Sequence, residues 1–312
     1  MNTIKTSKQN NINQSKSQHT LRILFFISGI ILITAILCPL FKRKDGLYVY
    51  DELAVKVKCE DVKAEPDNSL QVIFLGDSEC YSSFAPDYLY EKYGYTSFVC
   101  GTAAQKICDS YAILYENFNT QSPDVVILET NNIFRGLAPV DDHWDPVLNT
   151  LLKNVPLFAN HSRWKPMARK LLPKKRELKR RENKGFVRRV GKKAYTSGKY
   201  MKKTDKSKKI NDDIKEYLVK INELCKEHNA TLILVSTPSA TNWNYKKHNG
   251  VAKWADANSV PYIDLNLEDG IKINWKKDTK DAGDHMNLRG AKKVTKFIGR
   301  YIKENYNLSD QR

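Results

Sequence analysis

Five short runs of apolar residues recur along the chain, and each ends at a small or polar residue. Residues 70–75, 124–128 and 231–235 are apolar almost throughout, whereas 95–99 and 261–265 are weaker examples. Runs that are apolar at successive positions are typical of strands buried on both faces of a parallel sheet. The chain is therefore constrained to a fold in which helices cover both sides of a central sheet.

Segments with helical spacing alternate with these runs. They are residues 103–118, a helix capped by Asn211 or Asp212 with Ile214, Leu218, Ile221 and Cys225 on one face, residues 245–257 and residues 288–306. Alternating strands and helices predict an α/β fold, a flavodoxin-like three-layer sandwich around a mostly parallel five-stranded sheet. In such folds ligands bind beyond the carboxyl ends of the strands.

Residues 23–41 form an uncharged, mostly apolar stretch of nineteen positions. As a helix it spans about 28 Å, close to the ~30 Å hydrocarbon core of a bilayer. Signal peptides usually have a shorter apolar region, so an uncleaved single-span anchor is predicted, with a signal peptide as the alternative. Flanking basic residues slightly favour a cytoplasmic N-terminus. We therefore expect a cytoplasmic tail (1–22), an anchor in the cell membrane, a polar connector (42–69) and an extracytoplasmic domain (70–306).

Polar residues follow the strands at the point where each would end. Ser78 comes after the first run, Gly101 after the second and Asn131 after the third. His285 lies just ahead of the last helix, with two aspartates near it in sequence. We expect these groups at one edge of the sheet, because the carboxyl ends of parallel strands meet there. A hydroxyl, amide and backbone donors and an imidazole are the parts needed for acyl transfer.

This order of residues resembles the SGNH hydrolase superfamily, also called GDSL esterases, over about residues 70–305. The family's first motif, Gly-Asp-Ser, occurs after the first run and implies that Ser78 is the nucleophile. The resemblance also implies that backbone N–H groups of Ser78 and Gly101 and the amide of Asn131 form the oxyanion hole. The final motif implies that His285 is the general base.

Two positions depart from the family pattern. The third motif usually begins with glycine, where this chain has Glu129, and the last motif has an aspartate three residues before the histidine, where this chain has Ala282. Asp281 and Asp284 are both candidates for the carboxylate that orients His285. The sequence leaves this choice open.

Four further residues are candidates for substrate contact. Asp77 and Asn132 belong to the first and third motifs, whereas His161 and Trp164 come after the third run. The latter two could line an acceptor cleft. Alternatively, Trp164 could pack the following segment onto the domain while His161 caps it.

The implied reaction is attack of Ser78, deprotonated by His285, on an ester or thioester carbonyl. Water as acceptor gives an esterase and a sugar or polyol hydroxyl gives an acyltransferase. The run His285-x-Asn-x-x-Gly resembles membrane-anchored bacterial members acting on teichoic acids or exopolysaccharide. The expected substrate is therefore an acylated glycan or teichoic-acid-like polymer of the cell envelope. A non-catalytic polymer-binding or scaffolding protein of the same fold is the alternative. No Cys-x-x-Cys pair or Cys/His cluster occurs, so no metal is expected, and no cofactor is expected either.

The net charge of +17 belongs to one segment. Residues 161–210 contain 21 Lys and Arg against 3 Asp and Glu, which leaves 31 against 32 in the rest of the chain. All but the last residue of this segment fall within an insertion expected at 153–209. It could be a solvated loop, or it could bind an anionic lipid or polymer. No nucleic-acid-binding motif accompanies it, so nucleic acid is not an expected partner.

Overall fold

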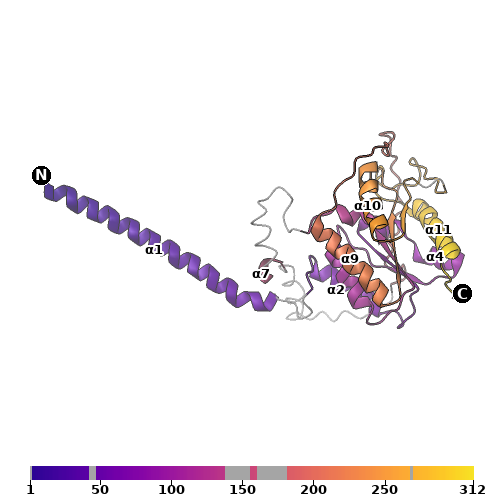
Figure 1. The fold of residues 1–312 in the computed structure, drawn as a ribbon, viewed down its shortest axis with the longest axis horizontal. Helices are drawn as coiled ribbons and strands as arrows, with labels where there is room; N and C mark the ends of the chain where they lie inside the picture. The colour runs from indigo at the N-terminus through magenta and orange to yellow at the C-terminus, as the bar shows by residue number, and fades with distance from the viewer. Residues whose placement is uncertain (1, 42–46, 138–154, 160–180, 268–269) are drawn as a thin grey trace.

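The computed structural model describes residues 2–41, 47–137, 155–159, 181–267 and 270–312 (Figure 1). Its sheet has five strands, β1 (Val72–Leu75), β2 (Ser97–Val99), β3 (Val125–Glu129), β4 (Thr231–Ser236) and β5 (Tyr262–Asp264). The strands are all parallel and lie in the order β2-β1-β3-β4-β5. The predicted fold class is confirmed, and the order is that of a flavodoxin-like sheet. The strand order reverses between β1 and β3, and the carboxyl ends of these strands are where such folds bind ligands.

Helices cover both faces of the sheet, because successive residues of a strand point to opposite sides. The helices of the domain are α2 (Glu52–Lys63), α3 (Ser78–Ser83), α4 (Pro86–Tyr93), α5 (Ile107–Asn117), α9 (Asp212–Glu227), α10 (Tyr245–Ala257) and α11 (Leu288–Asn305). In β1, Ile73 and Leu75 pack against the layer of α2, α5, α9 and α10. Val72 and Phe74 pack against the layer of α3, α4 and α11. The two layers lie on opposite sides of the strands in Figure 1.

Helix α2 occupies the segment that the sequence predicted to be a polar connector. Asp51 caps it by accepting a hydrogen bond from the backbone N–H of Ala54 at 3.1 Å. Val55, Cys59 and Val62 are buried in the same core cluster as residues of α5. The compact domain therefore includes residues before position 70. Three apolar residues at helical spacing among charged neighbours were too weak a signal to outweigh the polar composition.

Helix α1 (Asn2–Phe41) contains the predicted membrane stretch. Residues Gln18–Phe41 are long and apolar enough to cross a membrane, and none of this window is buried against the rest of the protein. At 1.5 Å per residue, 24 residues extend over about 36 Å. A signal sequence near the N-terminus has the same properties.

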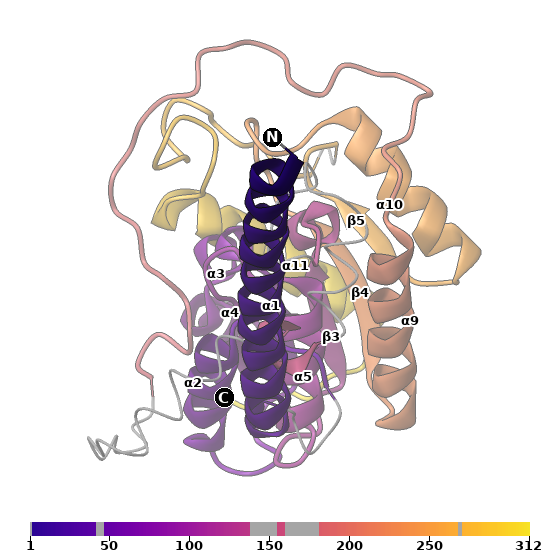
Figure 2. The same cartoon turned by 90° about the vertical axis from the view of Figure 1, so that its left-hand side faces the viewer.

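Residues 181–210, here called the strap, run in extended form across the carboxyl edge of the sheet (Figure 2). The N–H of Val187 donates to the carbonyl of Tyr81 in α3 at 2.8 Å. The N–H of Leu288 donates to the carbonyl of Arg189 at 2.7 Å, at the start of α11. These bonds tie this part of the basic segment to the domain, which a solvated loop would not require.

Candidate functional site

The turn after β1 places Ser78 at the start of α3. Gly76 has φ of +147°, and a Cβ atom there would lie 2.8 Å from the Cβ of Glu129 and 2.9 Å from that of Cys80. Asp77 caps the helix, because its Oδ1 accepts a hydrogen bond from the Glu79 N–H at 3.0 Å. Ser78 is half-buried, and its hydroxyl has no hydrogen-bond partner among the residues that the structure describes. The hydroxyl is therefore free to react.

Gly101 lies close against this turn. It is buried, and a Cβ atom at this position would lie 2.9 Å from the carbonyl oxygen of Asp77. Within the described parts of the chain, no acceptor is bonded to the Gly101 N–H. Buried backbone donors are almost always paired, so a free N–H beside Ser78 is suited to binding an oxyanion.

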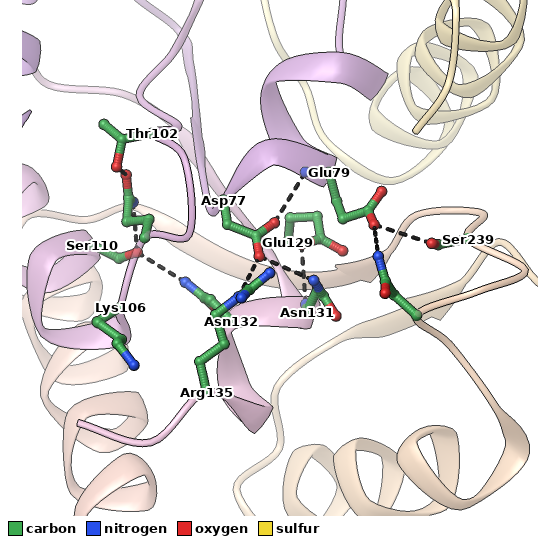
Figure 3. A network of polar contacts seen from close by, with 12 residues as sticks. Asp77, Glu79, Thr102, Lys106, Ser110, Glu129, Asn131, Asn132, Arg135 and Ser239 are labelled. Carbon is green, nitrogen blue, oxygen red and sulfur yellow. Dashed lines mark hydrogen bonds and ion pairs between the residues drawn. The ribbon is translucent and has the colours of Figure 1, made fainter. Parts of the chain in front are cut away.

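Asn131 approaches the same turn from η1 (Thr130–Phe134), a short 3-10 helix that follows β3. Its Nδ2 donates to Asp77 Oδ2 at 3.0 Å, and Arg135 Nε donates to the same oxygen at 2.8 Å (Figure 3). An amide nitrogen carries two hydrogens, so one remains for another acceptor. The Oδ1 atom of Asn131 accepts from Lys247 Nζ at 3.5 Å, which fixes the orientation of the amide.

His285 is held by two carboxylates. Its Nδ1 lies 2.8 Å from Asp281 Oδ2 and 3.2 Å from Asp284 Oδ2, and its backbone N–H donates to Asp281 Oδ1 at 2.7 Å. Burial raises the pKa of Asp281, but the hydrogen bonds from His285 outweigh it and lower the pKa overall. A proton on Nδ1 leaves the lone pair on Nε2. That Nε2 atom is buried and has no hydrogen-bond partner among the described residues.

Glu79 lies between the turn that carries Ser78 and the loop that carries His285. Atoms of Glu79, Asp284 and His285 that could bind a metal all lie within 4.8 Å of one another. Glu79 Oε1 accepts a hydrogen bond from Ser239 Oγ at 3.0 Å (Figure 3). The same oxygen accepts from Asn242 Nδ2 at 2.8 Å, and Asn242 also donates to Asp284. Ser78 directly precedes Glu79, so the candidate nucleophile lies in the same region as the candidate base, although no hydrogen bond joins Ser78 to His285 among the described residues.

Two buried glutamates at this site were not expected from the sequence. Burial raises the pKa of Glu79 well above its usual value, and the nearby carboxylates of Asp77 and Glu129 raise it further. Burial also raises the pKa of Glu129, again assisted by Asp77. Glu129 stands where the SGNH motif that this sequence resembles has glycine. Its Oε2 accepts from the Asn131 N–H at 3.0 Å and its Oε1 accepts from Thr237 Oγ1 at 3.2 Å, so it holds the start of η1.

Of the four residues predicted to contact substrate, the structure describes two, Asp77 and Asn132. The side chain of Asn132 is fully buried, and its Nδ2 donates to Ser110 Oγ at 3.0 Å, so it fastens η1 to α5. Asp77 is also fully buried and bonds within the site. Both side chains are thus buried and bonded within the protein, and their contact with substrate stays a prediction. His161 and Trp164 lie outside the described residues.

Lys247 and Arg135 are cations that the sequence analysis did not single out. Burial, followed by the nearby positive charges of Lys208 and Arg135, lowers the pKa of Lys247 to about 8. Its Nζ atom lies 5.4 Å from the ring centroid of Phe134 and donates to the carbonyl of Asn242. In the sequence, Arg135 is only a positive charge beside the third motif, and Lys247 is only a positive charge near the start of a helix.

No protein-family model and no curated protein matches this sequence. Among solved structures, similar folds include a GDSL-like lipase from Bacteroides thetaiotaomicron, with a TM-score of 0.43 and 14% identity over 81% of this chain and 99% of that one. A lipase/acylhydrolase from Enterococcus faecalis has a TM-score of 0.40 and 13% identity, over 75% and 96% of the two chains. A family 3 carbohydrate esterase from Clostridium thermocellum has a TM-score of 0.37 and 13% identity, over 75% and 96%. At these identities the similarity concerns the fold.

Proposed function

We propose that this chain is a serine esterase or O-acyltransferase of the SGNH superfamily. The proposal rests on the hydrogen bonding of the two ring nitrogens of His285. Its Nδ1 is held by Asp281 at 2.8 Å, and its Nε2 is buried. Among the residues that the structure describes, neither this Nε2 nor the Ser78 hydroxyl at the same edge of the sheet has a hydrogen-bond partner. This is the arrangement of a general base that takes a proton from a serine.

The proposed reaction proceeds through an acyl-enzyme. His285 Nε2 accepts the Ser78 proton as the oxygen attacks an ester carbonyl, and Asp281 stabilises the imidazolium. The N–H groups of Ser78 and Gly101 and the second amide hydrogen of Asn131 donate to the oxyanion. The protonated His285 then returns its proton to the leaving alcohol. Water or an acceptor hydroxyl releases the acyl group by the reverse sequence.

We further propose that the acyl group is carried by a cell-envelope polymer or glycan. An N-terminal helix able to span a membrane would hold the domain beside the envelope, single-pass with the domain extracytoplasmic. The basic segment would attract an anionic polymer or lipid, because an excess of one sign of charge raises the local concentration of the opposite sign.

Fluorophosphonate labelling of the membrane-bound full chain tests the proposal, with mass mapping of the labelled residue. We expect label on Ser78, and none in the Ser78→Ala variant. Ser83→Ala is the matched control, because Ser83 lies on the same helix with a buried hydroxyl that has no partner among the described residues. If both variants labelled like the wild type, Ser78 would not be the nucleophile. An unlabelled wild type that still bound an anionic polymer would identify a scaffolding protein of this fold.

A further inference from the structure

A basic cleft lies between the strap and the start of α11. Its volume is about 530 Å³, within the range of small-molecule sites. Six cationic side chains line it: Arg189, Lys192, Lys277, Arg289, Lys292 and Lys293. The strap supplies two of them, and the other four come from outside the basic segment 161–210. The positive charge of the cleft therefore comes from several separate segments of the chain, and not from the basic segment alone.

One carboxylate offsets part of this charge. Asp278 is fully buried, with Oδ1 at 2.8 Å from Arg289 Nε and Oδ2 accepting from Lys293 Nζ. None of the nine residues lining the cleft is acidic. Lys192 and Lys277 have no ion pair among the described residues, and both are exposed. Cations gathered in this way repel one another, and an anion in the cleft would relieve that repulsion.

The cleft adjoins the candidate active site. Arg189 Nε donates to Ser82 Oγ at 3.0 Å in α3, the helix that begins with Ser78. Asn287 also lines the cleft, two residues after His285, and its Nδ2 donates to the carbonyl of Lys277 at 2.9 Å. A molecule in the cleft would therefore lie beside both the serine helix and the histidine loop.

Side chains, rather than backbone groups, would hold an anion here. The first N–H groups of α11 are already bonded, since Asn287 Oδ1 accepts from the N–H groups of Arg289 and Gly290 at 3.0 and 3.2 Å. The dipole of this 18-residue helix still favours negative charge at its N-terminus. Arginine and lysine together suit phosphate, because its charged oxygens can be approached by several cations at once, whereas one arginine satisfies a carboxylate bidentately.

We propose that this cleft binds a phosphodiester of the polymer whose ester is cleaved or transferred at Ser78. The inference rests on the proposed function, because it names the anionic part of the same substrate. The phosphate sits in the cleft while the neighbouring acyl-bearing unit reaches the serine. The substrate class is thus a polyol-phosphate or sugar-phosphate chain bearing O-acyl groups.

Calorimetric binding of a soluble glycerol-phosphate oligomer tests this, using the full chain with Ser78→Ala in neutral detergent micelles. The pocket variant Lys192→Gln/Lys292→Gln removes two lining charges. The matched control Lys202→Gln/Lys203→Gln removes two exposed lysines from the strap that do not line the cleft. We expect roughly tenfold weaker binding in the pocket variant and less than a twofold change in the control. Melting temperatures of both variants establish that they fold, and Lys277→Gln serves as a second pocket variant.

Three outcomes would overturn the proposal. Equal loss in both double variants would mean that diffuse charge binds the oligomer. Equal or tighter binding of a polygalacturonate chain would mean that the cleft does not select phosphate. Tighter binding to phosphatidylglycerol vesicles, lost in the pocket variant, would make the cleft a membrane contact. Because the Ser78→Ala chain cannot turn over, binding is measured apart from catalysis. Failure of this proposal leaves Ser78 labelling intact, and failure of labelling leaves the binding result interpretable.

Discussion

The buried carboxyl of Glu79 leads to a quantitative prediction about stability. This side chain is 1% exposed and lies beside Ser78. One oxygen accepts two hydrogen bonds, and the other, Oε2, has no partner among the described residues. Burial, followed by the charges of Asp77 and Glu129, raises its pKa well above the usual value. The folded protein therefore keeps a proton on Glu79 at pH values where the unfolded chain has lost it.

The sign and size of the effect follow from proton linkage. An unfolded glutamate has a pKa of about 4.3, so the stability associated with the bound proton is fully present below that pH. It is lost as the pH rises from there through the raised folded pKa, with a slope of at most about 1.4 kcal/mol per pH unit. Glu79→Gln does not titrate and keeps an oxygen acceptor for Ser239 and Asn242. Between pH 5 and 7 the variant should gain up to ~2.7 kcal/mol over the wild type.

Thermal unfolding followed by near-ultraviolet circular dichroism at pH 5, 6 and 7 measures this gain in one detergent. For a domain of this size the melting temperature of Glu79→Gln should rise relative to the wild type as the pH rises, by at most roughly 5–11 °C over that range. The exposed Glu223 on α9 supplies the control, because Glu223→Gln makes the same substitution at a site where the side chain is not buried. A Glu79→Gln difference that stays constant or shrinks as the pH rises would refute the reasoning.

Two further predictions concern the site. Asp281→Asn should reduce kcat/KM on p-nitrophenyl acetate by about 10²–10⁴-fold, because it removes the charge that stabilises the imidazolium, whereas Asp284→Asn should cost less than tenfold. Equal losses would assign the role to both carboxylates. Gly76→Ala should lower the free energy of unfolding by about 2 kcal/mol or more, through its backbone angle and the two contacts below 3 Å. Gly198→Ala, at positive φ with nothing within 4 Å, should cost about 1 kcal/mol, and a matching loss at both glycines would contradict the steric argument.

Much of the fold could be predicted because the strands are buried on both faces. Such strands must be apolar at successive positions, so β1, β3 and β4 stand out from their neighbours. Helix α10 begins and ends where its pattern predicts, at Tyr245 and Ala257. Helices α3 and α4 were not predicted, because six and eight residues are too few to display a helical period.

The sequence predicted which residues lie at the site, but not which way their side chains point. The apolar pattern of the sequence predicts the topology of the sheet. That topology places Ser78, Gly101 and Asn131 directly after strands. The side chain of Asn132 turns toward α5 because of the local geometry of η1, which no spacing rule reveals. The choice between the two aspartates was likewise open, since it depends on how the loop folds back to His285.

Backbone groups join the part of the strap near Lys193 to the loop that carries His285. Besides the bonds at Val187 and Leu288, the N–H of Lys193 donates to the carbonyl of Thr279 at 3.2 Å, and the N–H of Ala282 donates to the carbonyl of Lys193 at 3.0 Å. Main-chain bonds do not depend on which side chain each residue carries. The strap can therefore exchange its outward charges, one substitution at a time, without loosening the loop that holds His285. Under the proposed function, substitutions that change which anions the strap attracts would leave the backbone support of His285 unchanged.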